Sequence, residues 1–206
     1  MEFAKHNKIL VHQLHETLDL VAGLESRNKY EILDQNLKKI GFAVENGKGV
    51  KSFLLRNTFG FFRNYEILFY NQKRELEFIA HSPVRLFFTK YIIHDPFNKP
   101  IGEIQQKFSV FSRSFEVSKI SKAGTKLTLT MEQPIFSFWT FKFRYKNEEV
   151  AKVEKKWSGL LSEVFTDKDK FLISFEKNKL DEAFKKLIVA ASVFIDIQYF
   201  ENNHKN

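Results

Sequence analysis

Two carboxylates, Asp167 and Asp169, stand two residues apart just before a short apolar segment. Alternate acidic side chains of this kind begin many calcium-binding loops, because they converge on one hard cation. Counted from Asp167, the sixth position is Leu172, where an EF-hand needs a turn glycine, and the twelfth is Asn178 rather than a bidentate glutamate. Two interpretations stay open: an incomplete calcium site with Asp167, Asp169 and Asn178 as ligands, or an Asp-rich turn ahead of a strand. Such a strand would place three apolar side chains on one face: Phe171, Ile173 and Phe175.

Other titratable residues suggest less chemistry. His12, His15 and Glu16 are close together, but their order is not the His-Glu-x-x-His of zinc peptidases. Asp196 and Glu201 lie near the end of an expected helix, where a carboxylate opposes the helix dipole, so we expect Asp196 to have a basic or backbone N–H partner. The chain has no cysteine, nucleophile elbow, phosphate-binding glycine loop or zinc motif. We therefore predict that the protein is not an enzyme, and calcium is the one cofactor that its sequence suggests.

Basic residues outnumber acidic ones, 33 to 25, and give the chain a net charge of +8. Such an excess favours polyanionic partners, either nucleic acid or an anionic membrane surface, although it also serves solubility. The lysines are scattered in pairs rather than gathered in one run. Five of them are candidate contacts for a lipid headgroup or another polyanion: Lys152, Lys155, Lys156, Lys185 and Lys186.

A helix near the C-terminus and the strands before it would position these groups. Leu180–Phe200 has no glycine or proline and begins with the acidic Asp181 and Glu182, which suit the positive end of a helix dipole. Its centre, Leu187–Ile195, is apolar except for Ser192, so the helix must be surrounded by protein or by lipid. This centre is well short of the roughly 20 apolar residues that span a bilayer. We expect a helix enclosed by the rest of the chain, with a membrane-inserted segment as the alternative.

From Lys29 onward, short segments of β-forming residues alternate with turn signals, and the hydrophobic period falls to two. All four prolines fall in the breaks. The pattern indicates an antiparallel sheet that is closed around the helix or packed on it. The expected strands are Lys29–Ile32, Gly41–Val44, Val50–Leu55, Tyr65–Tyr70, Leu76–Ala80, Phe87–Ile93, Ile101–Phe108, Phe115–Ile120, Lys126–Met131, Phe136–Tyr145, Val150–Trp157 and Phe171–Phe175.

A second helix is expected near the N-terminus. Apolar residues recur at three- and four-residue spacing from Ile9 to Ala22, and Gly23 would end the helix. Because the chain has no Ser/Gly/Pro-rich linker, residues 1–206 are predicted to form one domain. In this domain the N-terminal amphipathic helix, 9–22, and the C-terminal helix, 180–200, bracket a β-barrel over 29–176.

Five short motifs resemble the phospholipid scramblase family and, more widely, the LURP-one-related and tubby-like superfamily. They occur in the family's order and at nearly its spacing: Glu25–Ile32 (ESRNKYEI), Pro100–Gln106 (PIGEIQQ), Val153–Leu160 (VEKKWSGL), Glu163–Phe171 (EVFTDKDKF) and Phe194–Glu201 (FIDIQYFE). The resemblance covers nearly the whole chain. It implies a closed antiparallel β-barrel of about twelve strands around a mostly buried, hydrophobic C-terminal helix.

The resemblance also implies where a calcium-binding segment would lie. It maps onto Asp167, Asp169 and Asn178, with the apolar face of the following strand, but the family has a carboxylate where Asn178 stands. Glu176 replaces the family's usual proline. The proline-rich N-terminal arm and the lipid-modified cysteine cluster of the family have no counterpart in this sequence.

Three functions compete on this basis. The first is a scramblase-like, non-enzymatic protein that binds anionic phospholipid headgroups at a membrane surface. The second is true phospholipid scrambling, with Leu187–Ile195 entering the bilayer. The third is a soluble scaffold or a nucleic-acid-binding protein. No small-molecule substrate is predicted, and the oligomeric state stays open. The first residues lack the continuous apolar core of a signal peptide, so we expect a cytoplasmic protein, peripheral to a membrane in the first case.

Overall fold

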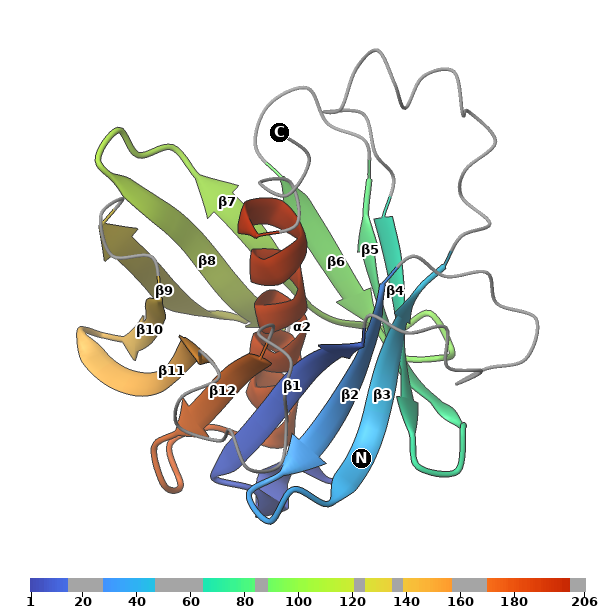
Figure 1. Cartoon of the computed structure of the whole chain (residues 1–206). Helices are drawn as coiled ribbons and strands as arrows, with labels where there is room; N and C mark the ends of the chain where they lie inside the picture. The colour runs from blue at the N-terminus through green and yellow to red at the C-terminus, as the bar shows by residue number, and fades with distance from the viewer. Residues whose placement is uncertain are drawn as a thin grey trace.

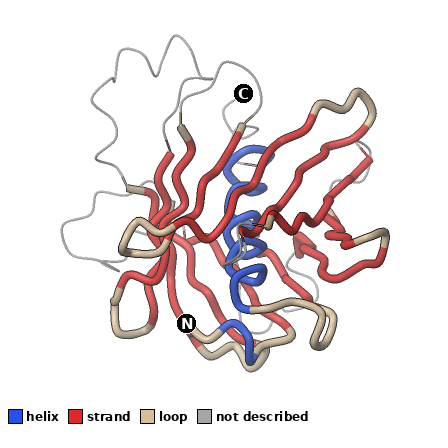
Figure 2. Tube along the Cα trace, turned by 180° about the vertical axis from the view of Figure 1, so that it is seen from behind, coloured by secondary structure: helices blue, strands red, loops and turns tan. Residues whose placement is uncertain are grey.

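The computed structural model is a closed antiparallel β-barrel of twelve strands with one long helix, α2, running through it (Figure 1). It describes residues 1–14, 28–46, 65–83, 89–120, 125–134, 139–156 and 170–200. Each strand pairs with its neighbours in the sequence, and β1 pairs with β12 to close the ring. Seen from behind, the strands surround the helix in the same way (Figure 2). The predicted barrel around a C-terminal helix is therefore confirmed.

The elements follow one another along the chain without any crossover. They are η1 (Phe3–Lys5, a short 3₁₀ helix), β1 (Lys8–Leu14), β2 (Lys29–Asp34), β3 (Lys39–Glu45), β4 (Tyr65–Asn71), β5 (Leu76–Ser82), β6 (Lys90–His94), β7 (Pro100–Lys107), β8 (Ser112–Ile120), β9 (Lys126–Pro134), β10 (Thr140–Tyr145), β11 (Glu148–Lys156), β12 (Lys170–Phe175) and α2 (Glu182–Tyr199).

The strands alternate as a barrel wall requires, with one side chain toward the helix and the next toward solvent. On β10, Phe141 and Phe143 are fully buried, whereas Lys142 between them is exposed. Aromatic rings fill much of the space between wall and helix, as the stacked pair of Tyr91 and Phe194 illustrates. The predicted inward face of β12 is confirmed, since all three of its side chains join the core: Phe171, Ile173 and Phe175.

The helix α2 is capped at its N-terminus and buried along nearly its whole length. Asp181 caps its first turn, because the side-chain oxygen accepts a hydrogen bond from the backbone N–H of Phe184 at 3.0 Å. From Phe184 to Ile197 every residue except Lys186 is buried. The barrel wall therefore supplies the surroundings that the all-round apolar sequence demands. No helix in the described ranges has the length and hydropathy of a membrane span.

Gly102 on β7 lies where the barrel wall packs closely against α2, and the space there leaves no room for a side chain. A Cβ atom at this position would lie 2.3 Å from the carbonyl oxygen of Ser118 and 2.8 Å from a methyl carbon of Leu187. Both distances are far inside van der Waals contact. The glycine of the Pro100–Gln106 motif therefore has a structural role: it lets α2 lie against β7 and β8.

Three hairpins at the N-terminal end of α2 use one turn design. In each, an Asp or Asn side chain accepts hydrogen bonds from the backbone N–H groups two and four residues later. The residue three positions later has a left-handed backbone, with φ between 61° and 64°. The side chains that cap these turns are Asp34, Asn71 and Asp95. All three turns thus fall in breaks between the expected strands.

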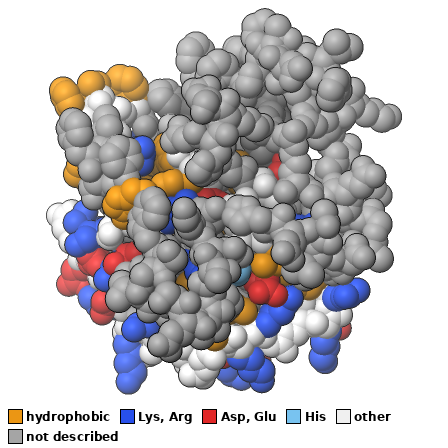
Figure 3. All heavy atoms as spheres, viewed as in Figure 1, with side chains coloured by type: hydrophobic (Ala, Val, Ile, Leu, Met, Phe, Trp, Pro, Cys, Tyr) orange, Lys and Arg blue, Asp and Glu red, His pale blue; other side chains and the backbone are white. Residues whose placement is uncertain are grey.

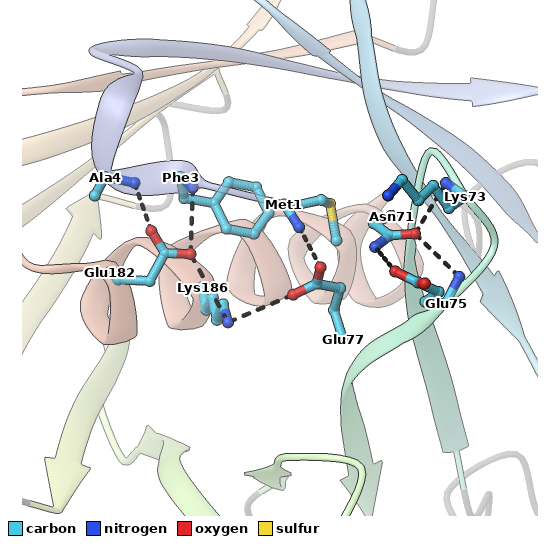
Figure 4. Close-up of polar contacts among 9 residues, drawn as sticks. All are labelled: Met1, Phe3, Ala4, Asn71, Lys73, Glu75, Glu77, Glu182 and Lys186. Carbon is cyan, nitrogen blue, oxygen red and sulfur yellow. Dashed lines mark hydrogen bonds and ion pairs between the residues drawn. The ribbon is translucent and has the colours of Figure 1, made fainter.

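The N-terminal residues fill the same end of the barrel (Figure 4). The Phe3 ring is fully buried, and its backbone N–H donates to the Glu182 carboxylate at 3.2 Å. The backbone N–H of Ala4 donates to the other oxygen of Glu182 at 2.5 Å. Lys186 stands between Glu182 and Glu77, with 3.7 Å to each carboxylate. These contacts hold η1 beneath the first turns of α2, and we call this the filled end of the barrel.

The predicted helix over 9–22 is wrong for its first part. Lys8–Leu14 is strand β1, whose backbone pairs with both β2 and β12. Five consecutive residues, Ile9–Gln13, are buried, so both faces of the strand are covered. A strand covered on both faces loses the alternation that would have identified it, and its apolar run also fits a helical spacing. Residues 15–22 lie outside the described part of the chain, as does the predicted strand Val50–Leu55.

Replacing Ala191 with Asp should prevent folding in detergent-free buffer. Ala191 is 4% exposed at the centre of α2, and an uncompensated buried charge costs about 3–5 kcal/mol. Circular dichroism and urea denaturation would report the loss of structure. Lys177→Asp introduces the same side chain in an exposed turn and should leave the unfolding midpoint unchanged. An Ala191→Asp protein of normal stability would show that α2 is not enclosed.

Candidate functional site

Buried polar side chains gather at the end of the barrel where α2 finishes, opposite the filled end. They belong to the ends of strands at this side of the barrel, to residues next to those ends, or to the last turns of α2. The set comprises His12, Gln13, Asn28, Glu45, Ser82, Gln133, Lys155, Lys170 and Asp196. Buried polar groups need compensating partners, so this concentration makes the region the candidate functional site. We call it the polar end.

Asp196, which is 1% exposed, is the central carboxylate of the polar end. It accepts a hydrogen bond from the hydroxyl of Tyr30 at 3.1 Å, and the Nζ of Lys155 lies 3.7 Å from its other oxygen. Lys155 also stands 3.8 Å from the centre of the Phe200 ring, a cation–π distance. The predicted basic partner of Asp196 is therefore confirmed. The ammonium offsets the unfavourable position of a carboxylate near a helix C-terminus. Glu201 lies outside the described residues.

A second group of hydrogen bonds joins the rim of three adjacent strands. The side-chain amide of Gln13 donates to Asn28 at 3.4 Å, and the amide of Asn28 donates to the Glu45 carboxylate at 2.8 Å. Gln13 is near the end of β1, Asn28 immediately precedes β2, and Glu45 ends β3. The contacts tie the strands together where their connections leave the barrel.

Across the ring, Arg113 on β8 and Gln133 on β9 are register partners. The guanidinium of Arg113 lies 4.3 Å from the centre of the Tyr199 ring. Burial raises the pKa of Tyr199 to about 12, so its phenol is neutral at pH 7. We call this group the Arg113–Gln133 site.

Gln133 is the unusual member of this site. It is 1% exposed, and neither its Nε2 nor its Oε1 has a hydrogen-bond partner among the described residues. Leaving a buried amide unsatisfied costs about 1–3 kcal/mol. An amide donor beside a guanidinium suits an anionic oxygen, because both groups donate hydrogen bonds and one is charged. The arrangement can therefore hold a carboxylate or phosphate oxygen, and it contains no nucleophile.

Apolar surface lies directly beneath the Arg113–Gln133 site. The next inward register pair toward the filled end is Phe115 and Met131. These two side chains help to line a small apolar cavity between the wall and α2, together with Ile104, Val117, Phe143, Ala191, Phe194 and Ile195. The site is thus polar at the rim and apolar below, as an amphiphile is polar at its head and apolar along its chain.

The five candidate lysines are not brought together. Lys155 is held inside the polar end by Asp196. Lys185 and Lys186 lie at the filled end, about ten residues or roughly 15 Å along α2 from Asp196. Lys185 donates to the carbonyl oxygens of Ala4 and His6, and burial lowers the pKa of its ammonium. Lys152 is half-buried on β11, where its ammonium pairs with Glu154 at 3.1 Å, and nothing is described of the Lys156 side chain.

The calcium-like segment is interrupted by strand β12. Asp167 and Asp169 lie outside the described residues, whereas Asn178 is in the exposed turn that follows β12. Lys170–Phe175 is extended, so its two ends are roughly 17 Å apart at about 3.3 Å per residue. Calcium ligands lie within 2.3–2.6 Å of the ion. Asn178 is therefore too distant to share an ion with a ligand at the start of β12. Among the described residues, no three His, Cys, Asp or Glu side chains are grouped around a possible metal position.

Sequence reasoning missed the Arg113–Gln133 site and the role of Tyr30. A signal for Gln133 was present in the sequence, because it continues the alternation of Leu127, Leu129 and Met131 toward the helix. Lys155 likewise continues the inward series of Ala151 and Val153. Polar residues at the end of an inward series can therefore indicate the polar rim of a barrel.

Comparison with known proteins identifies one family. The family model described as Scramblase matches residues 2–202. Mouse phospholipid scramblase 1 is 28% identical over 96% of this chain and 62% of its own length, and human phospholipid scramblase 2 is 29% identical over 94% and 67%. The Saccharomyces cerevisiae protein named altered inheritance rate of mitochondria protein 25 is 21% identical over 96% and 71%. The chain spans about three fifths of the length of phospholipid scramblase 1 from mouse, rat and human. No solved structure matches the chain.

Removing the charge of Asp196 should destabilise the protein more than replacing its whole polar group. Asp196→Ala leaves Lys155 buried without its partner, and we expect it to lower the free energy of unfolding by about 3–5 kcal/mol. The triple variant Tyr30→Phe, Lys155→Met, Asp196→Leu fills similar volume without charge and should stay within about 2 kcal/mol of the natural protein. Urea denaturation measures both. Equal decreases in the free energy of unfolding for the two proteins would contradict an energetic dependence of Lys155 on Asp196.

Restoring a carboxylate at position 178 should not create calcium affinity. Asn178→Asp keeps a residue that tolerates the left-handed backbone at φ 60°, so the variant should fold normally. Because the length of β12 separates this turn from the start of the strand, which Asp167 and Asp169 precede in sequence, we expect calorimetric calcium titrations of the two proteins to be indistinguishable. A gain of about tenfold or more in affinity, equivalent to about 1.4 kcal/mol, would show that the segment folds around one ion.

Proposed function

The chain belongs to the scramblase family, and we propose that it is a non-enzymatic protein that binds anionic phospholipid headgroups at a membrane surface. The family match over residues 2–202 is the observation that carries this proposal. The names of its relatives, phospholipid scramblases 1 and 2, supply the class of ligand. The Arg113–Gln133 site supports the proposal, because its groups suit an anionic oxygen.

The charge of the chain supports an anionic ligand. A net charge of +8 draws the protein toward anionic bilayers, where each basic residue close to the surface contributes about 1 kcal/mol. Lys152 remains a proposed headgroup contact, because its side chain is 39% exposed even though its ammonium pairs with Glu154. Lys155 and Lys185 stabilise the fold from inside the barrel. The long-range attraction therefore comes from the exposed basic residues as a whole rather than from one lysine cluster.

The Arg113–Gln133 site is the proposed position for a headgroup phosphate. Its guanidinium supplies charge, and the amide of Gln133 supplies a donor that has no other partner among the described residues. The apolar side chains of Phe115 and Met131 beneath it suit the glycerol and first methylene groups of a lipid. Binding at this site would offset the cost of the unsatisfied amide, which gives a reason for a buried Gln in an otherwise apolar inward series.

Phospholipid scrambling is the second candidate, and the names of the relatives are what favour it. Headgroup binding is a step that scrambling also requires, so the two proposals share the Arg113–Gln133 site. An assay with vesicles that carry a fluorescent lipid in both leaflets distinguishes binding from scrambling. Dithionite destroys only the label in the outer leaflet, unless lipids cross the bilayer. Quenching beyond the outer leaflet when the protein is present would establish scrambling.

Gln133→Leu should weaken lipid binding and strengthen the fold. The natural protein should co-sediment with vesicles that contain phosphatidylserine far more than with phosphatidylcholine vesicles, and salt should reduce the binding. Removing the unsatisfied amide should raise the free energy of unfolding by about 1 kcal/mol, whereas loss of the phosphate donor should lower vesicle affinity about tenfold.

The matched control is Gln35→Leu, which makes the same change in an exposed hairpin at the filled end and should alter neither quantity. Equal binding of the natural protein to neutral and anionic vesicles, or binding to neither, would contradict the headgroup proposal. If Gln133→Leu binds vesicles with normal affinity, the proposal of membrane binding stands, but the Arg113–Gln133 site is not where the headgroup binds.

A further inference from the structure

The connection between β7 and β8 presents three large apolar side chains to solvent. Phe108, Val110 and Phe111 are 75%, 60% and 83% exposed. Figure 3 shows hydrophobic side chains gathered at the upper left of the molecule, where Figure 1 places the turn between these strands. Single exposed apolar residues are ordinary, but three within four residues on a projecting turn are not. We call Phe108–Phe111 the β7–β8 tip.

The tip has a defined shape. The hydroxyl groups of Ser109 and Ser112 are 2.6 Å apart, and the backbone N–H of Ser112 donates to the Ser109 hydroxyl at 3.2 Å. At the base, Lys107 on β7 pairs with Glu116 on β8 at 3.1 Å. The exposed side chains are therefore carried on a turn that is already ordered, which reduces the entropy lost when they are buried against a partner.

The tip lies at the polar end of the barrel. Phe111 is two residues before Arg113, and β8 then runs toward the filled end. The described turns at the filled end are mostly polar: their central residues include Gln35, Asn36, Gln72, Lys73, Arg74, Lys146, Asn147, Lys177 and Asn178. Phe97 is an exception there, 91% exposed between Pro96 and Asn98, and Ile120 and Tyr145 at the ends of β8 and β10 are less exposed, at 44% and 37%. The two ends of the barrel thus present different chemistry.

We infer that the β7–β8 tip inserts into the interfacial layer of an anionic bilayer and so turns the polar end of the barrel toward the lipid headgroups. The choice of partner rests on the proposed function. Large apolar side chains on a rigid turn enter the boundary between headgroups and acyl chains readily, and nearby basic residues add attraction to anionic lipid. This insertion would bring the Arg113–Gln133 site to headgroup depth.

Size and charge favour a bilayer over a protein partner. A stable protein interface buries about 800 Å² on each side, and three side chains above the charged Lys107–Glu116 pair offer much less. A bilayer needs no complementary groove and accepts a small wedge. By sequence alone, residues 47–64, between β3 and β4, carry four basic residues and no acidic one: Lys48, Lys51, Arg56 and Arg63. This charge complements an anionic membrane.

The absence of cysteine allows one fluorescent label to be placed at will. Val110→Cys and Phe97→Cys proteins would each carry an environment-sensitive fluorophore and be mixed with phosphatidylserine-containing vesicles. The label at 110 should brighten and shift to shorter wavelength, as in an apolar surrounding, while the label at 97 should not change. In parallel, Phe108→Ser with Phe111→Ser should lower vesicle affinity at least about tenfold, and Phe97→Ser by less than about twofold.

The outcomes separate this inference from the proposed function. Co-sedimentation with vesicles but no response at 110 would overturn insertion of the tip and retain headgroup binding. A response at 97 instead of 110 would mean that the filled end faces the membrane. A response at 110 that grows with protein concentration in the absence of vesicles would identify the tip as a contact between copies of the chain. No vesicle binding by the natural protein would remove both proposals.

Discussion

The enclosure of α2 is the constraint on which the rest of the structure depends. A helix that is apolar on every side cannot lie on a protein surface in water, so the chain must supply a wall all the way around it. Twelve antiparallel strands do so, and closure leaves no edge strand open to aggregation. Gly102 follows from the same requirement, because the wall can approach the helix only where a side chain is absent. The aromatic residues of the strands and of α2 fill the remaining space.

Closure also dictates where a ligand can act. A barrel whose interior is filled by side chains leaves little room for a ligand inside, which favours binding groups displayed at an end. At the filled end, Phe3 and the contacts of Glu182 and Lys185 occupy the space below the first turns of α2. At the polar end, buried charges and amides stand where the strands finish. The two ends of one barrel therefore have separate tasks: one secures the helix, and the other offers polar groups above an apolar interior.

The sequence predicted this architecture better than its site. Periodicity identified α2 and most strands, because burial against a helix imposes a strict alternation on the wall. It failed at β1, where burial on both faces removed the alternation. It also could not tell which candidate lysines are enclosed, since sequence alone does not show that Lys155 and Lys185 are held inside the barrel while Lys152 is half-buried on its wall. The separation of Asn178 from the start of β12 could have been foreseen, however: an apolar face of alternate residues already implied an extended segment.

The same constraint bears on how such a protein could act on lipids. Moving α2 into a bilayer would take it out of a wall that was built around it, break the contact of Asp196 with Lys155 and Tyr30, and separate Lys185 from two backbone carbonyls. It would also leave the inward rings of the strands without a core, a loss of many well-packed side chains at about 1.5–3 kcal/mol each. Action through the polar end needs none of these losses, because its groups already stand at the rim. The energetics of the fold therefore favour a mechanism in which the barrel stays closed and the lipid comes to it.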